Sequence, residues 1–191
     1  KLTAKEFARL PKTYQQLAQG QLNLYSLFID VSLRLTAPGG QLGLITPAGF
    51  FGGQSFGALR ALLRREATVT QVDFIEPRNG AFLNVEQETA LTLLRKDANQ
   101  NTRTAVFVTN NARGFLSLGS FPAPAEPAAP WVLPRCKQDL KAVRAFDSPR
   151  WRLEDYGYQP KTGYLVPHRM PMPLLKSRGR KRAVYPLIWA T

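Results

Sequence analysis

The chain has 191 residues, a formal net charge of +13 at pH 7, one cysteine (Cys136) and one histidine (His168). A single cysteine excludes an internal disulfide framework and a cysteine-rich zinc site, and a single histidine argues against a Ser-His-Asp hydrolase. No apolar run approaches the roughly 20 residues that a membrane span needs, and the first residues lack a signal-peptide core. A cytoplasmic protein is therefore expected, with no membrane partner and no metal site.

The stretch from Asn23 to Pro47 predicts a helix followed by a buried strand. Asn23 is a candidate N-cap, and the helix should end before Pro38. The apolar residues at helical spacing, which we expect on the buried face, are Leu24, Leu27, Phe28, Val31 and Leu35. The short apolar run Leu42 to Thr46 follows a Gly-rich turn, as is typical of a strand covered on both faces.

The same order of elements then recurs. Residues Ser55 to Ala67 predict a second helix, and Val69 to Ile75 predicts a second strand. The apolar face of this helix consists of Phe56, Leu59, Leu62 and Leu63. A third strand, Thr89 to Leu94, follows a loop without room for a crossover helix, so we expect it to run antiparallel to its neighbours. The pattern predicts an α/β sheet whose last strand is reversed.

The remainder of the chain predicts a change of architecture. Thr104 to Thr109 is another strand, and with Thr89 to Leu94 it is a candidate hairpin. Residues Phe121 to Pro134 contain five prolines, which predict an extended, semi-rigid linker. A short helix is expected over Lys137 to Phe146, and beyond it short runs broken by Gly and Pro indicate a second domain. The expected boundaries are 1–120, 121–134 for the linker, and 135–191.

The positive charge is concentrated in the last third of the chain. Residues 1–134 contain 13 Lys and Arg against 9 Asp and Glu, whereas residues 135–191 contain 13 against 4. Concentrated positive charge is typical of proteins that bind polyanions, because neutralised phosphates release their counterions. The alternative is a basic surface that only contacts solvent.

Three blocks of sequence, NLYSLF, PGGQLGLITPAGFF and FLNVEQETALTLL, occur in this order. They resemble motifs of the γ-class N6-adenine DNA methyltransferases of restriction-modification systems, most like the Taq-type and fused restriction-methylase enzymes. The resemblance covers residues 21–95, and a weaker one covers 151–190. It implies that residues 1–120 are the C-terminal half of a class I S-adenosylmethionine-dependent methyltransferase sheet, Rossmann-like with a reversed last strand. Residues 135–191 would begin a target-recognition, DNA-binding region.

The resemblance also implies an activity. Enzymes of this family transfer methyl from S-adenosyl-L-methionine to adenine N6 after flipping the base out of the duplex. They use an Asn-Pro-Pro-Tyr-like motif and a Gly-rich cofactor loop, and this sequence has neither. In the family order both lie upstream, so we expect a C-terminal fragment without catalytic residues of its own that is inactive alone. Its partners would be double-stranded DNA and the missing N-terminal part of the same protein.

Two aromatic residues match positions with known roles in the family. Phe28 matches the aromatic that packs against the adenine ring of the cofactor, and Phe82 matches the one that stacks on the flipped target adenine. For Phe28 the alternative is a core position, since it lies on the apolar stripe of its helix. At Phe82 the family usually has a proline next, where this chain has Leu83.

A run of basic residues near the C-terminus is a candidate DNA-phosphate site. It reads KSRGRKR and contains Lys176, Arg178, Arg180, Lys181 and Arg182. Phosphate contacts position a protein on DNA without specifying the sequence. The alternative is a charge run that only contacts solvent. We interpret His168 and Cys136 as structural.

Two other functions fit parts of the pattern. One is a non-catalytic DNA-binding or specificity module, and the other is an S-adenosylmethionine methyltransferase that acts on RNA or protein. A wound sheet with a reversed strand argues against a bare DNA reader, but folds host many functions. A cofactor loop and an Asn-Pro-Pro-aromatic motif in the upstream coding sequence would separate these possibilities.

Overall fold

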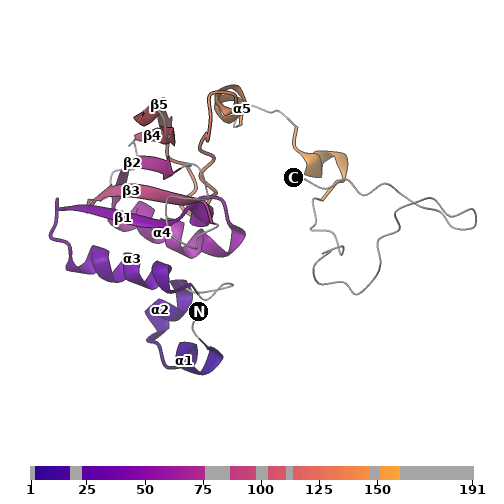
Figure 1. Cartoon of the computed structure of the whole chain (residues 1–191). Helices are drawn as coiled ribbons and strands as arrows, with labels where there is room; N and C mark the ends of the chain where they lie inside the picture. Colours follow the sequence, from indigo (N-terminus) through magenta and orange to yellow (C-terminus); the bar gives the residue numbers. More distant parts are fainter. Residues whose placement is uncertain are drawn as a thin grey trace, which may run out of the picture. The chain divides into compact units, whose positions relative to one another are not determined.

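The computed structural model describes residues 3–17, 23–75, 87–97, 103–110, 114–146 and 151–159. The chain forms two compact units, Lys1–Pro149 and Arg150–Thr191. The helices described in the first unit are α1 (Ala4–Ala8), α2 (Lys12–Leu17), α3 (Leu24–Leu35), α4 (Gly57–Glu66) and α5 (Asp139–Ala145) (Figure 1). Its described strands are β1 (Gln41–Pro47), β2 (Thr68–Ile75), β3 (Thr89–Arg95), β4 (Arg103–Asn110) and β5 (Gly114–Pro122). In the second unit, a short 3-10 helix spans Leu153–Tyr156.

The five strands form one mixed sheet in the order β1-β3-β2-β4-β5. Strand β3 is antiparallel to both β1 and β2, so β1 and β2 run parallel to each other on either side of it. β4 is parallel to β2, and β5 is antiparallel to β4. The predicted mixed α/β class and the reversed third strand are confirmed.

The predicted hairpin of Thr89 to Leu94 with Thr104 to Thr109 is wrong. These residues lie in β3 and β4, and β2 lies between the two strands. A short connection in the sequence suggested direct pairing, but β2 forms hydrogen-bonded ladders on both of its sides. The strand that pairs antiparallel with β4 is β5, which the sequence analysis did not predict.

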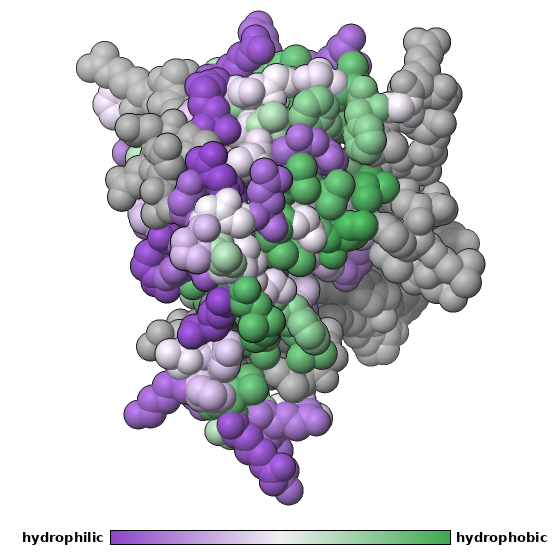
Figure 2. Space-filling view, turned by 90° about the vertical axis from the view of Figure 1, so that its left-hand side faces the viewer, coloured by the Kyte–Doolittle hydropathy of each residue, from purple (hydrophilic) through white to green (hydrophobic). Residues whose placement is uncertain are grey.

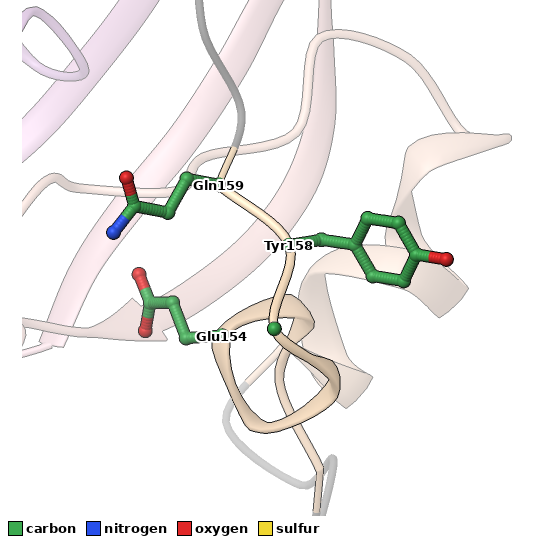
Figure 3. Close-up of a pocket in the computed structure, with 4 residues that line it drawn as sticks. Glu154, Tyr158 and Gln159 are labelled. Carbon is green, nitrogen blue, oxygen red and sulfur yellow. The ribbon is translucent and has the colours of Figure 1, made fainter.

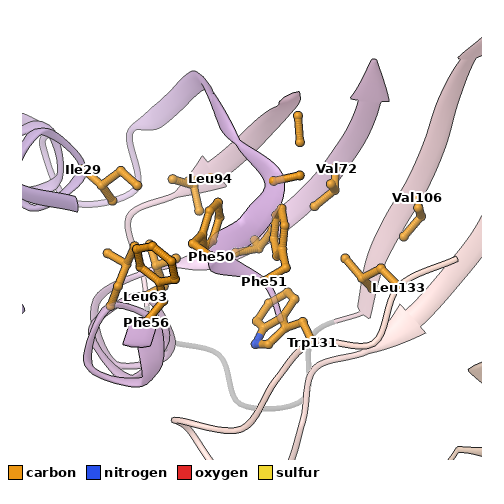
Figure 4. Close-up of a cluster of buried hydrophobic side chains, with 14 of the residues drawn as sticks. Ile29, Phe50, Phe51, Phe56, Leu63, Val72, Leu94, Val106, Trp131 and Leu133 are labelled. Atoms are coloured by element: carbon orange, nitrogen blue, oxygen red, sulfur yellow. The ribbon is translucent and has the colours of Figure 1, made fainter. Parts of the chain in front are cut away.

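Helices α3 and α4 lie on the same side of the sheet, and the hydrophobic core fills the space between them and the strands (Figures 1 and 4). The α4 face predicted from the sequence is confirmed, because Phe56, Leu59, Leu62 and Leu63 are all buried. They join buried β-strand residues such as Val72 and Leu94. Each buried Leu or Val side chain contributes about 1.5–3 kcal/mol to stability.

Helix α3 buries the face opposite to the predicted one. Its buried residues are Ser26, Ile29, Asp30 and Leu33, which recur at helical spacing. Its exposed residues include four of the five apolar residues assigned to the core, namely Leu24, Phe28, Val31 and Leu35. The spacing correctly predicted an amphipathic helix, but the more apolar of its two faces is open to solvent.

The Pro-rich segment, expected to be an extended, semi-rigid linker, packs against the first unit. Trp131 and Leu133 are buried in the core (Figure 4). The backbone N–H of Trp131 donates to the backbone carbonyl of Phe51 at 2.8 Å. The two compact units divide after Pro149 and not within residues 121–134. Prolines prevent this segment from joining a helix or a central strand, but they leave its Trp and Leu side chains free to fill the core. We call residues 123–135 the return segment.

Candidate functional site

The ends of three strands meet at one edge of the sheet. Pro47, the last residue of β1, and Ile75, the last residue of β2, are both in register with Thr89, the first residue of β3. In α/β sheets, ligands bind beyond the carboxyl ends of the parallel strands. We call this side of the sheet the carboxyl edge, and it is the candidate functional site.

The chain that leaves β1 is fixed at this edge by backbone contacts. The N–H of Ala48 donates to the carbonyl of Glu88, just before β3, at 2.9 Å. Two 3-10 turns follow, Ala48–Phe50 and Gln54–Phe56, and they bury the rings of Phe50 and Phe51. The segment that connects β1 to α4 is therefore rigidly placed beside the carboxyl edge.

Arg60 on α4 donates hydrogen bonds to the backbone of the connection between β1 and α4. Its side chain is only 3% exposed and donates to three backbone carbonyls, Phe50 O at 2.8 Å, Gly53 O at 2.7 Å and Ala128 O at 3.0 Å. Burial lowers the pKa of the Arg60 guanidinium from its ordinary value, and the three acceptors compensate for its desolvation. Arg60 thus links the connection after β1 to the return segment.

Arg135, at the end of the return segment, lies at the carboxyl edge itself. Its guanidinium carbon is 3.5 Å from the ring centroid of Phe74, the penultimate residue of β2. Its Nε donates to Glu88 Oε1 at 2.6 Å, and its Nη1 donates to Leu133 O at 3.0 Å. One side chain therefore contacts the end of β2, the entry to β3 and the return segment.

A carboxylate on α5 fixes the backbone at Arg135. Asp139 Oδ2 accepts from the N–H of Arg135 at 2.8 Å and from that of Cys136 at 3.1 Å. These bonds, first of all the one from Arg135, hold the pKa of Asp139 below its usual value. Cys136 is a free, half-buried thiol.

The sequence-predicted site residues fall in different places. Phe28 is described, and it projects from the open face of α3 with 66% of its surface exposed, so it does not occupy the alternative core position. Phe82 lies outside the described residues, as do His168 and the basic residues Lys176, Arg178, Arg180, Lys181 and Arg182. The structure therefore does not give the distance between the two aromatic candidates, Phe28 and Phe82.

Sequence reasoning missed Arg60, Glu88 and Arg135. A signal for Arg60 was available, because it lies between Leu59 and Leu62 on the predicted buried face of its helix, where an Arg needs internal acceptors. Arg135 and Glu88 carry no such signal. They are far apart in the sequence, and only the path of the return segment brings them together.

The second unit carries a cluster of exposed aromatic side chains. Trp151 and Tyr156 have ring centroids 6.5 Å apart, and Tyr158 is also exposed. Beside them is an open hollow of about 360 Å³, lined by Glu154, Gly157, Tyr158 and Gln159. Figure 3 shows Glu154 and Gln159 on one side of this hollow, whereas the ring of Tyr158 projects away. The described lining offers only two polar side chains, Glu154 and Gln159, besides that of Tyr158, which is fewer than a small-molecule site typically has.

The described part of the chain contains neither a candidate membrane span nor a candidate metal site. None of its helices has the length and apolar character required to cross a membrane. Among the same residues, no group of three or more His, Cys, Asp or Glu side chains is arranged to hold a metal ion.

The first part of the chain is similar to a known protein family. Residues 1–82 match the Eco57I restriction-modification methylase family. The matched segment contains α1 to α4 and both β1 and β2, so it includes the open face of α3 and two strands of the carboxyl edge. The resemblance to restriction-modification methylases is thereby confirmed over this segment. No curated protein sequence matches the chain.

Solved structures with partial similarity also come from restriction-modification systems. The type IIG restriction endonuclease BpuSI aligns with 57% of this chain at 21% identity and a TM-score of 0.46. A modification subunit of a putative type I restriction enzyme from Vibrio vulnificus YJ016 aligns with 78% at 10% identity and 0.46, and the EcoKI M protein with 56% at 16% identity and 0.41. The aligned parts cover only 13%, 29% and 23% of those chains.

Proposed function

We propose that the chain is part of a site-specific DNA adenine-N6 methyltransferase of a restriction-modification system. The parent enzyme transfers methyl from S-adenosyl-L-methionine to an adenine flipped out of the duplex. The observation that carries this proposal is the match of residues 1–82 to restriction-modification methylases. The sequence contains no Asn-Pro-Pro-aromatic motif, so the chain supplies no catalytic residue and is inactive alone.

The N-terminal half of the same methyltransferase domain is the proposed partner at the β1 edge of the sheet. β1 is an edge strand of sequence QLGLITP, without a charged residue to prevent strand addition. At the other edge, β5 has a left-handed Gly119 at φ +105°, a register shift and a terminal proline, all of which discourage pairing. Only β1 is therefore suited to extend the sheet.

The open face of α3 supports the same partner. α3 leads directly into β1, and connections between parallel strands are right-handed. A strand that precedes α3 in the chain would therefore lie at the free edge of β1. The helices that cover this strand would pack on the exposed residues of α3, Leu24, Phe28, Val31 and Leu35. Figure 2, which views the side with α3 and β1, shows hydrophobic residues in a band down the molecule.

Two site assignments belong to this proposal. Phe28, exposed on α3, packs against the adenine ring of S-adenosylmethionine, where the second half of the domain encloses the cofactor. Phe82 stacks on the flipped target adenine, and a base–aromatic stack contributes about 1–3 kcal/mol. Phe82 belongs to the segment that joins β2 to β3, two strands that end and begin at the carboxyl edge.

The C-terminal residues are proposed to contact the DNA backbone. Lys176, Arg178, Arg180, Lys181 and Arg182 would neutralise phosphates, so that affinity for duplex DNA falls by a factor of up to about 500 between 50 and 200 mM salt. Residues 135–191 are proposed to begin the target-recognition region. We propose a cytoplasmic location, where the DNA substrate is present.

The decisive experiment uses the full-length protein and labelled S-adenosylmethionine. Methyl transfer into unmethylated genomic DNA, followed by nucleoside mass spectrometry, should yield N6-methyladenine. Residues 1–191 alone should yield none. Methylated RNA or protein with unmodified DNA would instead support the alternative substrate, and DNA binding by a full-length protein without any methyl transfer would support a non-catalytic specificity module.

A further inference from the structure

Arg135 and Glu88 form an ion pair that no sequence motif indicates. The Arg135 Nε to Glu88 Oε1 distance is 2.6 Å, and both side chains are largely shielded, with 31% and 23% of their surfaces exposed. A pair at this depth is less screened by solvent than one on the open surface. Because the Arg135–Glu88 pair lies at the carboxyl edge, its geometry affects the shape of the candidate functional site.

The orientation of the Arg135 guanidinium is set by three groups. The ring centroid of Phe74 lies 3.5 Å from its central carbon, Glu88 accepts from Nε, and Leu133 O accepts from Nη1. Arginine suits this arrangement because its planar guanidinium stacks on a ring and donates in fixed directions at the same time. A lysine ammonium carries the same charge, but it is not planar and cannot stack on the ring of Phe74.

The two side chains that Arg135 contacts stand at the two ends of one connection. Phe74 is at the end of β2, and Glu88 precedes the first residue of β3. The Glu88 carbonyl in turn accepts from the N–H of Ala48, the first residue after β1. By holding Phe74 and Glu88 together, Arg135 fixes the relative positions of the ends of β1, β2 and β3.

We propose that Arg135 is a positioning residue for methyl transfer: it fixes the carboxyl edge of the sheet, from which the target-base segment between β2 and β3 departs. This inference rests on the proposed function. Arg135 does not touch the reacting atoms in this role, and it acts through Phe74 and Glu88. Small displacements of a positioned group reduce rates by a factor of about 100, so loss of Arg135 lowers kcat and leaves cofactor affinity unchanged.

The first experiment measures methyl transfer by the full-length enzyme to unmethylated genomic DNA. Arg135→Gln should lower kcat by about 10- to 100-fold, with Kd for S-adenosylmethionine and KM for DNA within about twofold. Arg135→Lys should restore part of kcat, because it keeps the charge opposite Glu88. The matched control is Arg65→Gln, which removes an exposed arginine at the end of α4, outside the proposed target-recognition region, and should change nothing.

A kcat for Arg135→Gln within twofold of the wild-type value would overturn the proposal. Equal losses of kcat and of folded protein would also overturn it, since they would indicate a purely structural role. If Arg135→Gln does not fold, Glu88→Gln decides. This variant keeps a neutral acceptor for Nε and should lower kcat by a smaller factor with an unchanged Kd for the cofactor, whereas an unchanged kcat would overturn the proposal.

The second experiment does not depend on activity. Amide hydrogen exchange on residues 1–191 should show faster exchange at Ala48 and Thr89 in Arg135→Gln than in the wild type or in Arg65→Gln. Unchanged exchange at both amides would overturn the positioning role even if the enzyme methylates DNA. If the wild-type full-length protein transfers no methyl group, the proposed function fails, the catalytic part of this inference fails with it, and the exchange result separately decides whether Arg135 fixes the edge.

Discussion

Helices α3 and α4 lie on the same side of the sheet, but they differ in how much of their apolar surface is buried. α4 turns its leucines toward the strands, and its one buried charge, Arg60, is bonded to three carbonyls. α3 buries Asp30 and Ser26 beside Ile29 and Leu33, and leaves Phe28 and other large apolar side chains in solvent. An apolar patch of this kind on a folded domain marks an interaction surface. The core of this chain supplies the environment of α4, whereas we propose that a partner covers the outer face of α3.

The buried charge on α3 supports this interpretation. Asp30 is 1% exposed and its carboxylate accepts from Arg34 Nε at 3.0 Å, whereas the Arg34 side chain is largely exposed. Burying a carboxylate costs free energy that a leucine at the same position would not. The arrangement of α3 is therefore set by requirements on its outer face as well as by the core of this chain.

The largest expected effect on stability compares leucines from the two helices. Leu59→Ala in α4 should lower the free energy of unfolding by about 2–5 kcal/mol, because it leaves a cavity in the core. Leu35→Ala in α3, where the side chain is 82% exposed, should change it by less than about 0.5 kcal/mol. Urea unfolding of residues 1–191 measures both. Similar losses for the two variants would show that the outer face of α3 is already packed.

The next effect concerns the arginines of α4. Arg60→Met should destabilise the chain by about 3 kcal/mol, because the carbonyls of Phe50, Gly53 and Ala128 lose a charged donor. Arg65→Met removes only an exposed ion pair with Glu66 and should cost less than about 1 kcal/mol. Equal unfolding midpoints for the two variants would contradict the anchoring role of Arg60.

A third test addresses the outer face of α3 directly. Phe28→Ser should weaken association of residues 1–191 with the separately expressed upstream part of the protein by about 10- to 100-fold, because about 1.5–3 kcal/mol of apolar burial is lost. The unfolding midpoint of the isolated chain should not change. Phe146→Ser, at an exposed aromatic residue just after α5, is the control and should leave association intact. Association that survives Phe28→Ser would remove this face from the interface.

The smallest effect is expected on the inner face of α3. The buried hydroxyl of Ser26 has no hydrogen-bond partner within the described residues. Ser26→Ala should therefore be neutral or stabilise the chain by up to about 1 kcal/mol, since it removes an unsatisfied polar group and introduces a better helix former. Thr36→Ala, which deletes a 2.7 Å bond to Ser32 O, should be mildly destabilising. A marked loss of stability in Ser26→Ala would show that this hydroxyl has a partner after all.

Local sequence predicted most of the elements that line the carboxyl edge. The apolar run Leu42 to Thr46 predicted β1, and the run that ends at Ile75 predicted β2. The loop before Thr89 is too short for a crossover helix, which predicted that β3 is reversed. The site residues that depend on distant contacts were not predicted. Arg135 meets Glu88 only because Trp131 and Leu133 fill the core and draw the Pro-rich segment back across the strand ends.

The sequence by itself determined α3, α4, α5 and the strands β1 to β4, the direction of the third strand and the similarity to restriction-modification methylases, because periodicity, chain breakers and motifs are local properties. Tertiary structure decided which face of α3 is buried, that β3 lies between β1 and β2, and that the return segment packs on the core. The physical reason is that an amphipathic helix or an apolar strand has two possible faces or neighbours, and its choice depends on the surfaces that it meets. For α3, those surfaces include a partner that we propose to be the other half of the enzyme.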